Sequence, residues 1–136
     1  MVLGFPIFKI DVSYDRNMVY HLEYKGIRLD VYAKDRDNKH YNVEMQIRRE
    51  PALIKRARYY HSQMDIELLA SGTDYEELSD TFVIFICDYD PFGKELYCYT
   101  CGTMCKEDNS VDCEDGCGTI YLSTTGKMLR KYRRVL

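Results

Sequence analysis

The sequence predicts an α/β (α+β) fold, in which a mixed β-sheet carries flanking helices. Three observations predict it: two alternating segments, a helical pattern after them, and a continuous apolar run after the helix. The chain has 136 residues, which is about the length of one domain. We therefore expect a single domain over residues 1–136.

Two segments of period two predict a β-hairpin. Apolar and polar residues alternate over Ile27–Lys34 and again over Tyr41–Ile47, which gives two half-buried strands. The polar stretch Asp35–Asn38 is expected to be the hairpin loop. Before it, Met18–Tyr24 alternates loosely and Lys25-Gly26 is expected to form a turn.

Asp30 and Glu44 are the first candidate site. If the loop centres near Asp37, the two carboxylates lie opposite one another on the polar face of the hairpin. Like charges at that spacing are destabilising, and a hard divalent cation would compensate them. The alternative interpretation is that both are solvent-exposed residues neutralised by Arg28 or Lys34.

The middle of the chain predicts a helix and a central strand. Pro51 suits a helix start and Gly72 a helix stop, while Thr73 is expected to cap a short helical turn. Phe82–Cys87 is typical of a strand covered on both faces, and Leu96–Thr100 is expected to be a further strand. The inward stripe of the helix recurs at spacings of three and four: Leu53, Ala57, Tyr60, Met64 and Leu68.

Composition and charge exclude several classes of protein. The apolar content of 46% and the charged content of 30% are those of a globular protein, not of a disordered or fibrous one. A net charge of −3 argues against coating nucleic acid through bulk charge. Two basic stretches, Arg48–Arg58 and Lys127–Arg134, are either a polyanion-binding surface or ordinary solvated faces.

The chain shows no feature of a membrane or secreted protein. Its longest apolar run, Phe82–Cys87, is far shorter than the ~20 residues that cross a bilayer. The first residues lack the basic and apolar regions of a secretory signal. We expect a cytoplasmic protein with no membrane partner.

A cysteine-rich loop is expected at about residues 98–118. Closely spaced thiolates can enclose zinc, but the spacing lacks two paired C-x2-C units, which argues against zinc. The alternative interpretation is a variable loop with free thiols. The candidate zinc ligands are Cys98, Cys101, Cys105, Cys113 and Cys117.

Five segments together resemble the PD-(D/E)-x-K nuclease family transposases, also called recombination-promoting nuclease/putative transposases. They follow one another in order, and the resemblance runs from about residue 25 to 126. The segments are Lys25–Tyr32, Tyr41–Gln46, Lys55–Tyr60, Val83–Cys87 and Asp90–Gly93.

The resemblance implies a restriction-endonuclease-like fold and DNA cleavage that depends on Mg²⁺, with Mn²⁺ as a possible substitute. It makes Asp30 the metal-binding aspartate and Glu44 the acidic residue of the second motif strand. Gln46 occupies the position where many related nucleases carry lysine. The expected catalytic residues are thus Asp30, Glu44 and Gln46. Gln46 would orient the attacking water through its amide without supplying a positive charge.

DNA is the implied partner. Basic and aromatic residues on the helix after the second motif strand are expected to contact it. The alternative interpretation is that the arginines are ordinary surface residues and that most of the tyrosines pack in the core. A homodimer is expected to help in cutting both strands. The candidate nucleic-acid-binding residues are Lys55, Arg56, Arg58 and Tyr60.

A second function remains open at this point. The helical regions that members of the family carry before and after these segments have no clear match, which predicts a chain truncated at both ends relative to the family. The alternative to a nuclease is a catalytically inactive remnant that acts as a DNA-binding or protein-interaction module, zinc-stapled if the cysteines bind metal.

Overall fold

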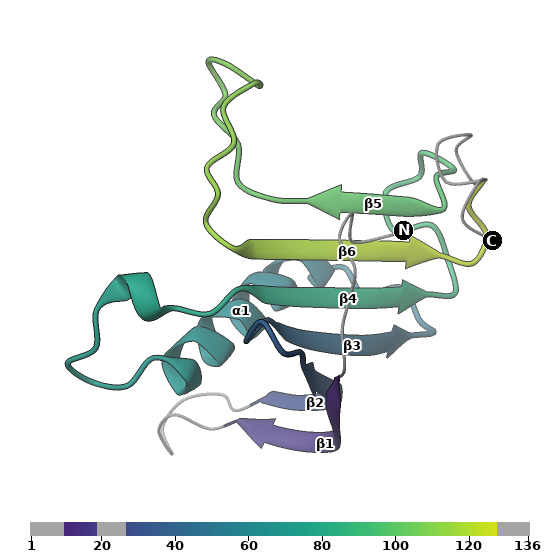
Figure 1. Ribbon diagram of the computed structural model, residues 1–136. Coiled ribbons are helices and arrows are strands. Elements are labelled where there is room, and N and C mark those ends of the chain that lie inside the picture. Colours follow the sequence, from purple (N-terminus) through teal and green to yellow (C-terminus); the bar gives the residue numbers. More distant parts are fainter. Residues whose placement is uncertain (1–9, 19–26, 128–136) are drawn as a thin grey trace.

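The computed structural model describes residues 10–18 and 27–127. In these residues, six strands form one mixed sheet in the order β1-β2-β3-β4-β6-β5, and α1 lies against one of its faces (Figure 1). The predicted α/β fold with a mixed sheet is confirmed. Among the described residues, α1 is the one α-helix. The elements are β1 (Asp11–Met18), β2 (Ile27–Lys34), β3 (His40–Gln46), α1 (Leu53–Leu68), the 3-10 helix η1 (Tyr75–Glu77), β4 (Thr81–Cys87), β5 (Cys98–Cys101) and β6 (Cys117–Ser123).

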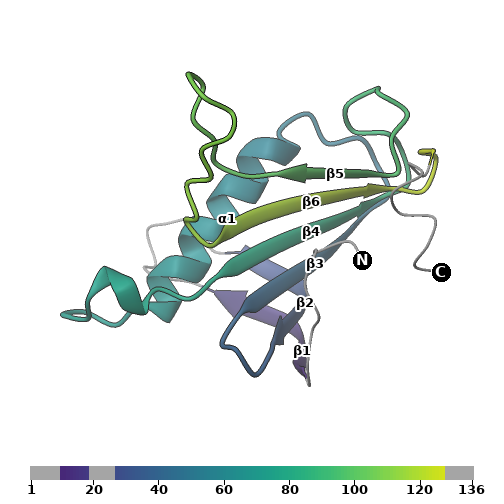
Figure 2. The ribbon, with the colours of Figure 1, turned by 45° about the horizontal axis from the view of Figure 1, so that its top comes forward.

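The sheet combines an antiparallel half with a parallel centre. β1, β2 and β3 are antiparallel neighbours, whereas β3 pairs with β4 in parallel and β4 with β6 in parallel. A parallel pair needs a crossover, and α1 supplies it between β3 and β4 (Figure 2). β5 closes the edge antiparallel to β6.

The hairpin register is the predicted one. Val31 pairs with Val43, so Asp30 and Glu44 stand at the next position along the two strands. The loop between the strands is organised by Asp35, which accepts hydrogen bonds from two backbone N–H groups of the loop and from the Tyr41 hydroxyl. This loop geometry fixes the register.

The face of the hairpin that alternation marks as polar is the face that α1 covers. Tyr32, Asn42 and Glu44 are buried there, whereas Met45 and Ile47 are exposed. The interpretation of Glu44 as a solvent-facing residue is therefore wrong. Its polar atoms tolerate burial because neighbouring side chains hydrogen-bond to them, as described below.

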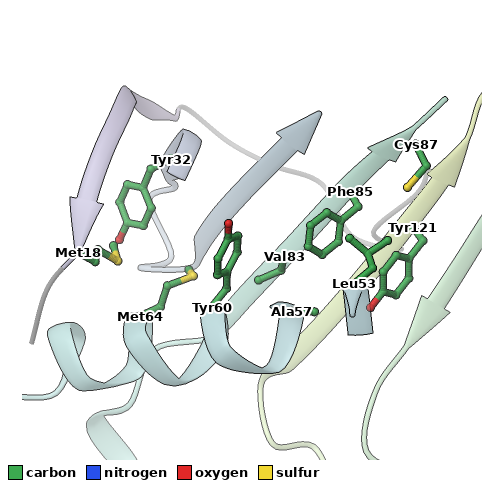
Figure 3. Close-up of a cluster of buried hydrophobic side chains, with 10 residues drawn as sticks. All are labelled: Met18, Tyr32, Leu53, Ala57, Tyr60, Met64, Val83, Phe85, Cys87 and Tyr121. Atoms are coloured by element: carbon green, nitrogen blue, oxygen red, sulfur yellow. The ribbon is translucent and has the colours of Figure 1, made fainter. Parts of the chain in front are cut away.

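The core lies between α1 and the sheet (Figure 3). The predicted helix stripe is confirmed, with Leu68 only partly buried at its end. Opposite it, the Phe85 ring stacks between the rings of Tyr60 and Tyr121, at centroid distances of 6.4 and 5.5 Å. These rings fix the distance between helix and sheet.

Two predictions around the helix need correction. The helix is shorter than the interval from Pro51 to Gly72, because residues 51–52 form a turn and the chain becomes extended at Leu69. The cap of the short turn is Asp74 and not Thr73, since the Asp74 carboxylate accepts from the backbone N–H of Glu76.

The strands also differ in part from the prediction. In β4, alternate residues are buried against α1, but Phe82, Ile84 and Ile86 on the other face keep partial exposure. The strand expected at Leu96–Thr100 begins at Cys98. The sequence reasoning missed β6 and most of β1; Met18 ends β1, and the rest of the Met18–Tyr24 segment and the Lys25-Gly26 turn lie outside the described residues.

The cysteine-rich region is only partly a loop. β5 and the first residues of β6 occupy its two ends, and the chain between them projects from the sheet with one bridge between Met104 and Asp112 (Figure 1). In the described part of the chain, no helix is long and apolar enough to cross a membrane.

Candidate active site

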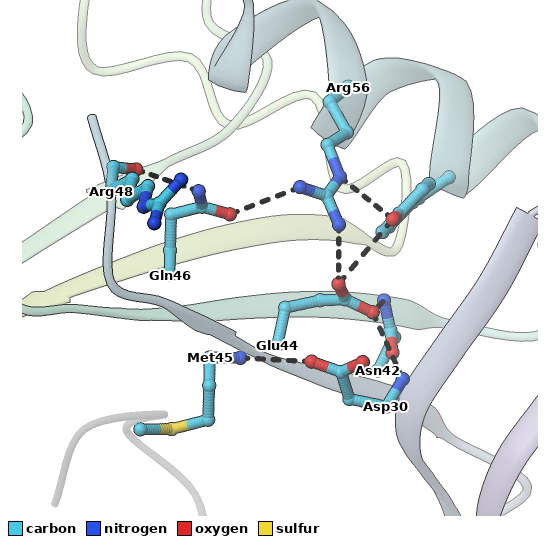
Figure 4. Close-up of polar contacts among 8 residues, drawn as sticks. Asp30, Asn42, Glu44, Met45, Gln46, Arg48 and Arg56 are labelled. Carbon is cyan, nitrogen blue, oxygen red and sulfur yellow. Dashed lines mark hydrogen bonds and ion pairs between the residues drawn. The ribbon is translucent and has the colours of Figure 1, made fainter. Parts of the chain in front are cut away.

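Asp30 and Glu44 lie where the regular pairing of β2 with β3 stops. The last pair of the ladder is Val31 with Val43, and beyond it side chains replace the backbone partners (Figure 4). The backbone N–H of Asp30 donates to Glu44 Oε1 at 3.2 Å, and the backbone N–H of Met45 donates to Asp30 Oδ2 at 3.3 Å. The two carboxylates are thus held at adjoining positions of neighbouring strands.

Glu44 is buried and has several partners. It is 1% exposed, and its Oε2 accepts from the Arg56 guanidinium at 2.8 Å and from the Tyr60 hydroxyl at 3.4 Å. Its Oε1 also accepts from the Asn42 amide at 3.1 Å. A buried carboxylate without such partners would be very costly, so these contacts allow it to stay inside.

Gln46 holds the other side of the same arginine. Its Oε1 accepts from Arg56 Nη1 at 3.0 Å, and its Nε2 donates to the carbonyl oxygen of Arg48 at 2.8 Å. The guanidinium of Arg56 therefore lies between Glu44 and Gln46 (Figure 4). A positive charge stands beside Gln46 although Gln46 itself carries none.

Aromatic rings fix the position of Arg56. Its Nε donates to the hydroxyl of Tyr60, one helical turn further along α1, at 2.8 Å. Its guanidinium carbon lies 5.1 Å from the centre of the Tyr60 ring and 6.0 Å from that of Phe85, within cation–π distance. The arginine is oriented by the helix and the core together.

Burial and charge shift the protonation equilibria of the pair. Burial raises the pKa of Glu44, and the negative charge of Asp30 adds to this, while hydrogen bonds and Arg56 oppose it. Burial lowers the pKa of Arg56, but its hydrogen bond to Tyr60 and the nearby negative charges outweigh that and leave it raised. Arg56 is therefore charged at any physiological pH, whereas Glu44 has a weakened tendency to ionise.

The candidate nucleic-acid-binding residues divide between two sides of α1. Arg56 and Tyr60 face Glu44, and Tyr60 is only 6% exposed, so it has no free face on which a base could stack. Lys55 and Arg58 are exposed on the helix. The structure brings together Asp30, Glu44, Gln46, Arg56 and Tyr60 but not these two.

The oxygen donors suit a hard divalent cation. Asp30 is exposed and Glu44 adjoins it, and Mg²⁺ commonly takes one or two carboxylates with retained waters and substrate phosphates. Beside Glu44, the Asn42 side-chain oxygen is buried and has no hydrogen-bond partner among the described residues. Within the described ranges, no three or more His, Cys, Asp or Glu side chains form a group that could hold a metal ion, so a cation here would depend on water and substrate for its other ligands.

The described structure does not gather the candidate zinc ligands. Cys98 is buried on β5, Cys101 and Cys113 are exposed, and no three of the cysteines form a metal-binding group within the described ranges. All of them are free thiols.

A family model described as PD-(D/E)XK nuclease family transposase matches residues 6–123. The chain belongs to this family. The match covers the segment that contains all six strands and α1, so the PD-(D/E)XK family accounts for the whole described sheet. Comparisons with curated proteins and with solved structures gave no significant match.

The sequence reasoning missed two features of this site. Asn42 was not singled out, although it precedes Glu44 and Gln46 on the same face of β3. Arg56 was expected to face DNA, yet it stands four residues before Tyr60, on the helix edge next to the inward stripe. That spacing is the signal that could have directed it toward Glu44.

Proposed function

We propose that this PD-(D/E)XK family chain is a metal-dependent DNA endonuclease that hydrolyses phosphodiester bonds at Asp30 and Glu44. The observation that carries the proposal is the pair of carboxylates at the end of the β2–β3 ladder. The buried carboxylate, Glu44, accepts a hydrogen bond from the Arg56 guanidinium. Oxygen donors of this kind beside a fixed positive charge suit the binding of a phosphate and a divalent cation together.

Asp30 and Glu44 would hold the cation, Mg²⁺ by preference with Mn²⁺ as a substitute. When bound, such an ion polarises the phosphoryl oxygen and lowers the pKa of the attacking water. Glu44 must be ionised to take part, and because burial raises its pKa, the affinity for the cation should increase with pH.

Arg56 supplies the positive charge that Gln46 lacks. Its guanidinium is 35% exposed as a side chain, so it contacts Glu44 while part of it stays accessible to a phosphate oxygen. Gln46 fixes the guanidinium through Oε1, and its amide nitrogen is engaged by the Arg48 carbonyl. These bonds support a positioning role for Gln46 in place of the water-orienting role expected from the sequence.

Exposed basic residues near the site would guide the DNA. Arg48 lies two residues after the end of β3, and Lys55 and Arg58 are exposed on α1. Because the net charge is −3, we propose that binding depends on this local surface and weakens with salt. The homodimer and the cytoplasmic location remain predictions from the sequence.

The test is cleavage of supercoiled plasmid by the purified full chain in Mg²⁺, in Mn²⁺ and in EDTA. We expect nicking or linearisation with either metal, none in EDTA, and loss of cleavage in Asp30→Asn. Asp37→Asn is the matched control, because Asp37 is an exposed acid in the adjoining hairpin loop.

Two results would contradict the proposal. Cleavage that persists in Asp30→Asn would come from another site or another protein. A folded wild-type chain that binds DNA in a salt-dependent manner but never cuts it would identify the inactive DNA-binding module instead.

A further inference from the structure

A pocket with a volume of about 290 Å³ opens beside the candidate active site. Its volume is at the lower end of the ~300–1,000 Å³ range of small-molecule sites. Two prolines complete its wall, and the side chains that determine its chemistry are Arg49, Glu50, Leu53, Ile54, Tyr89 and Phe92.

The pocket and the active site share one edge of the sheet. Arg49 follows the end of β3 by three residues, and Tyr89 follows the end of β4 by two. Figure 2 shows the chain passing from this edge to the start of α1. Leu53 lines the pocket, and Arg56 is the residue that donates a hydrogen bond to Glu44. They are three residues apart on the same helix, so their side chains are neighbours. The pocket therefore adjoins the arginine that contacts Glu44, and a nucleotide next to a phosphate bound at Arg56 would lie near the pocket.

Fixed aromatic rings form one side of the pocket. The guanidinium carbon of Arg49 lies 5.0 Å from the centre of the Tyr89 ring, and Arg49 Nη2 donates to the Asp90 carbonyl at 3.1 Å. The Tyr89 hydroxyl accepts from the backbone N–H of Glu50 at 3.2 Å. Because both side chains are already held in place, little ordering entropy would be lost when a planar ring enters.

The charge of the pocket favours a base over a phosphate. The Glu50 carboxylate repels phosphate, and the positive charge of Arg49 is already directed to Tyr89 and a backbone carbonyl. Glu50 uses Oε1 to accept from the backbone N–H of Ala52. A carboxylate in this position can also accept a hydrogen bond from the exocyclic amino group of a cytosine or an adenine.

We propose that this pocket binds one unpaired nucleobase of the DNA substrate, with an amino-bearing base preferred. The inference rests on the proposed endonuclease function and adds the substrate class to it: DNA with an unpaired base next to the scissile phosphate. Stacking on aromatic side chains contributes about 1–3 kcal/mol per base, which corresponds to about 5- to 150-fold in affinity.

The test compares binding of a labelled DNA duplex that carries one unpaired cytosine with binding of the same duplex fully paired. Fluorescence anisotropy in EDTA separates binding from cleavage. Ile54→Asp places a carboxylate in the pocket at a residue that is 61% exposed, so the fold should be unaffected. Ile66→Asp is the control, because Ile66 is an exposed isoleucine on the same helix that does not line the pocket.

We expect the wild-type chain to bind the duplex with the unpaired cytosine about tenfold more tightly than the paired one. Ile54→Asp should lose this preference and Ile66→Asp should keep it. Equal affinity of the wild-type chain for the two duplexes, or a preference that survives in Ile54→Asp, would overturn the inference while leaving the endonuclease intact. Failure to bind either duplex would overturn the DNA function together with it.

Discussion

Glu44 and Arg56 form an ion pair across the interface between sheet and helix, with 2.8 Å between Oε2 and Nη2. Glu44 comes from the middle of β3 and Arg56 from the first turns of α1. The pair therefore exists only when the helix packs on the sheet. The packing of α1 on the sheet therefore affects both the stability of the fold and the charge at the site, because it buries the Glu44 carboxylate and places the positive charge of Arg56 beside it.

Replacing Arg56 should affect the reaction more than replacing other basic residues of α1. We predict that Arg56→Gln lowers the cleavage rate by about 10²–10³-fold, the usual loss when one preorganised donor is removed. Arg56→Lys should restore part of it. Arg58→Gln, an exposed arginine of the same helix, should change the rate little. Similar losses in Arg56→Gln and Arg58→Gln, measured as single-turnover rates, would refute a special role for Arg56.

Gln46 should act through Arg56. We predict that Gln46→Ala lowers the rate by about fivefold, less than Arg56→Gln does, because it removes one hydrogen bond of about 1 kcal/mol to the guanidinium. In the Arg56→Gln background the same change should have little further effect. Independent, additive losses in this double-mutant cycle would show that Gln46 acts on the reaction separately.

Stability should fall in mild acid because of His61. Burial lowers the pKa of His61 to about 4, and the imidazole bridges the hydroxyls of Thr81 and Thr119. Between pH ~6.5 and ~4 the unfolded chain binds a proton that the folded chain does not, so the stability is complete above this range and is lost as the pH falls. We predict a loss of about 2–3 kcal/mol from this group, measured by urea unfolding at pH 7 and pH 4.5.

The control is the same measurement on His61→Gln, which can still donate and accept a hydrogen bond. Its free energy of unfolding should depend less steeply on pH. Some dependence will remain, because burial also lowers the pKa of His40 to about 4. Identical pH dependence in His61→Gln and wild type would show that His61 is not the group that titrates.

Phe85 should be among the most costly core residues to truncate. It is fully buried and stacks on both Tyr60 and Tyr121. We predict that Phe85→Ala destabilises the chain by about 3–5 kcal/mol in urea unfolding at pH 7. Tyr75→Ala, at a side chain that is 85% exposed, should change the stability by less than about 0.5 kcal/mol. Similar values for the two variants would contradict the described core.

The periodicity of the sequence was enough to predict the hairpin register and the helix stripe. Both depend on local geometry: a short loop fixes which residues pair, and residues three and four apart share a helix face. The pairing of Val31 with Val43 and the burial of Met64 follow directly from such patterns. For the same reason, Asp30 and Glu44 could be placed together before the structure was known.

Alternation could not predict which face of the hairpin the helix covers. Burial of Glu44 depends on hydrogen bonds from residues outside β3, above all Arg56, and a pattern of polar residues contains no information on such partners. β6 was missed because it follows the cysteine-rich segment, where Gly118 and the surrounding thiols obscure its apolar residues. For the covered face of the hairpin, contacts made through the tertiary fold override the local pattern.

The central claim is that Asp30 and Glu44 together hold a divalent cation, and titration of the chain with Mn²⁺, followed by electron paramagnetic resonance, tests it most directly. The account predicts one Mn²⁺ site per chain in the wild type, weakened more than about tenfold in both Asp30→Asn and Glu44→Gln and unchanged in Asp37→Asn. Undiminished binding of Mn²⁺ in Asp30→Asn and Glu44→Gln would contradict it, as would the absence of any site in the folded wild-type chain.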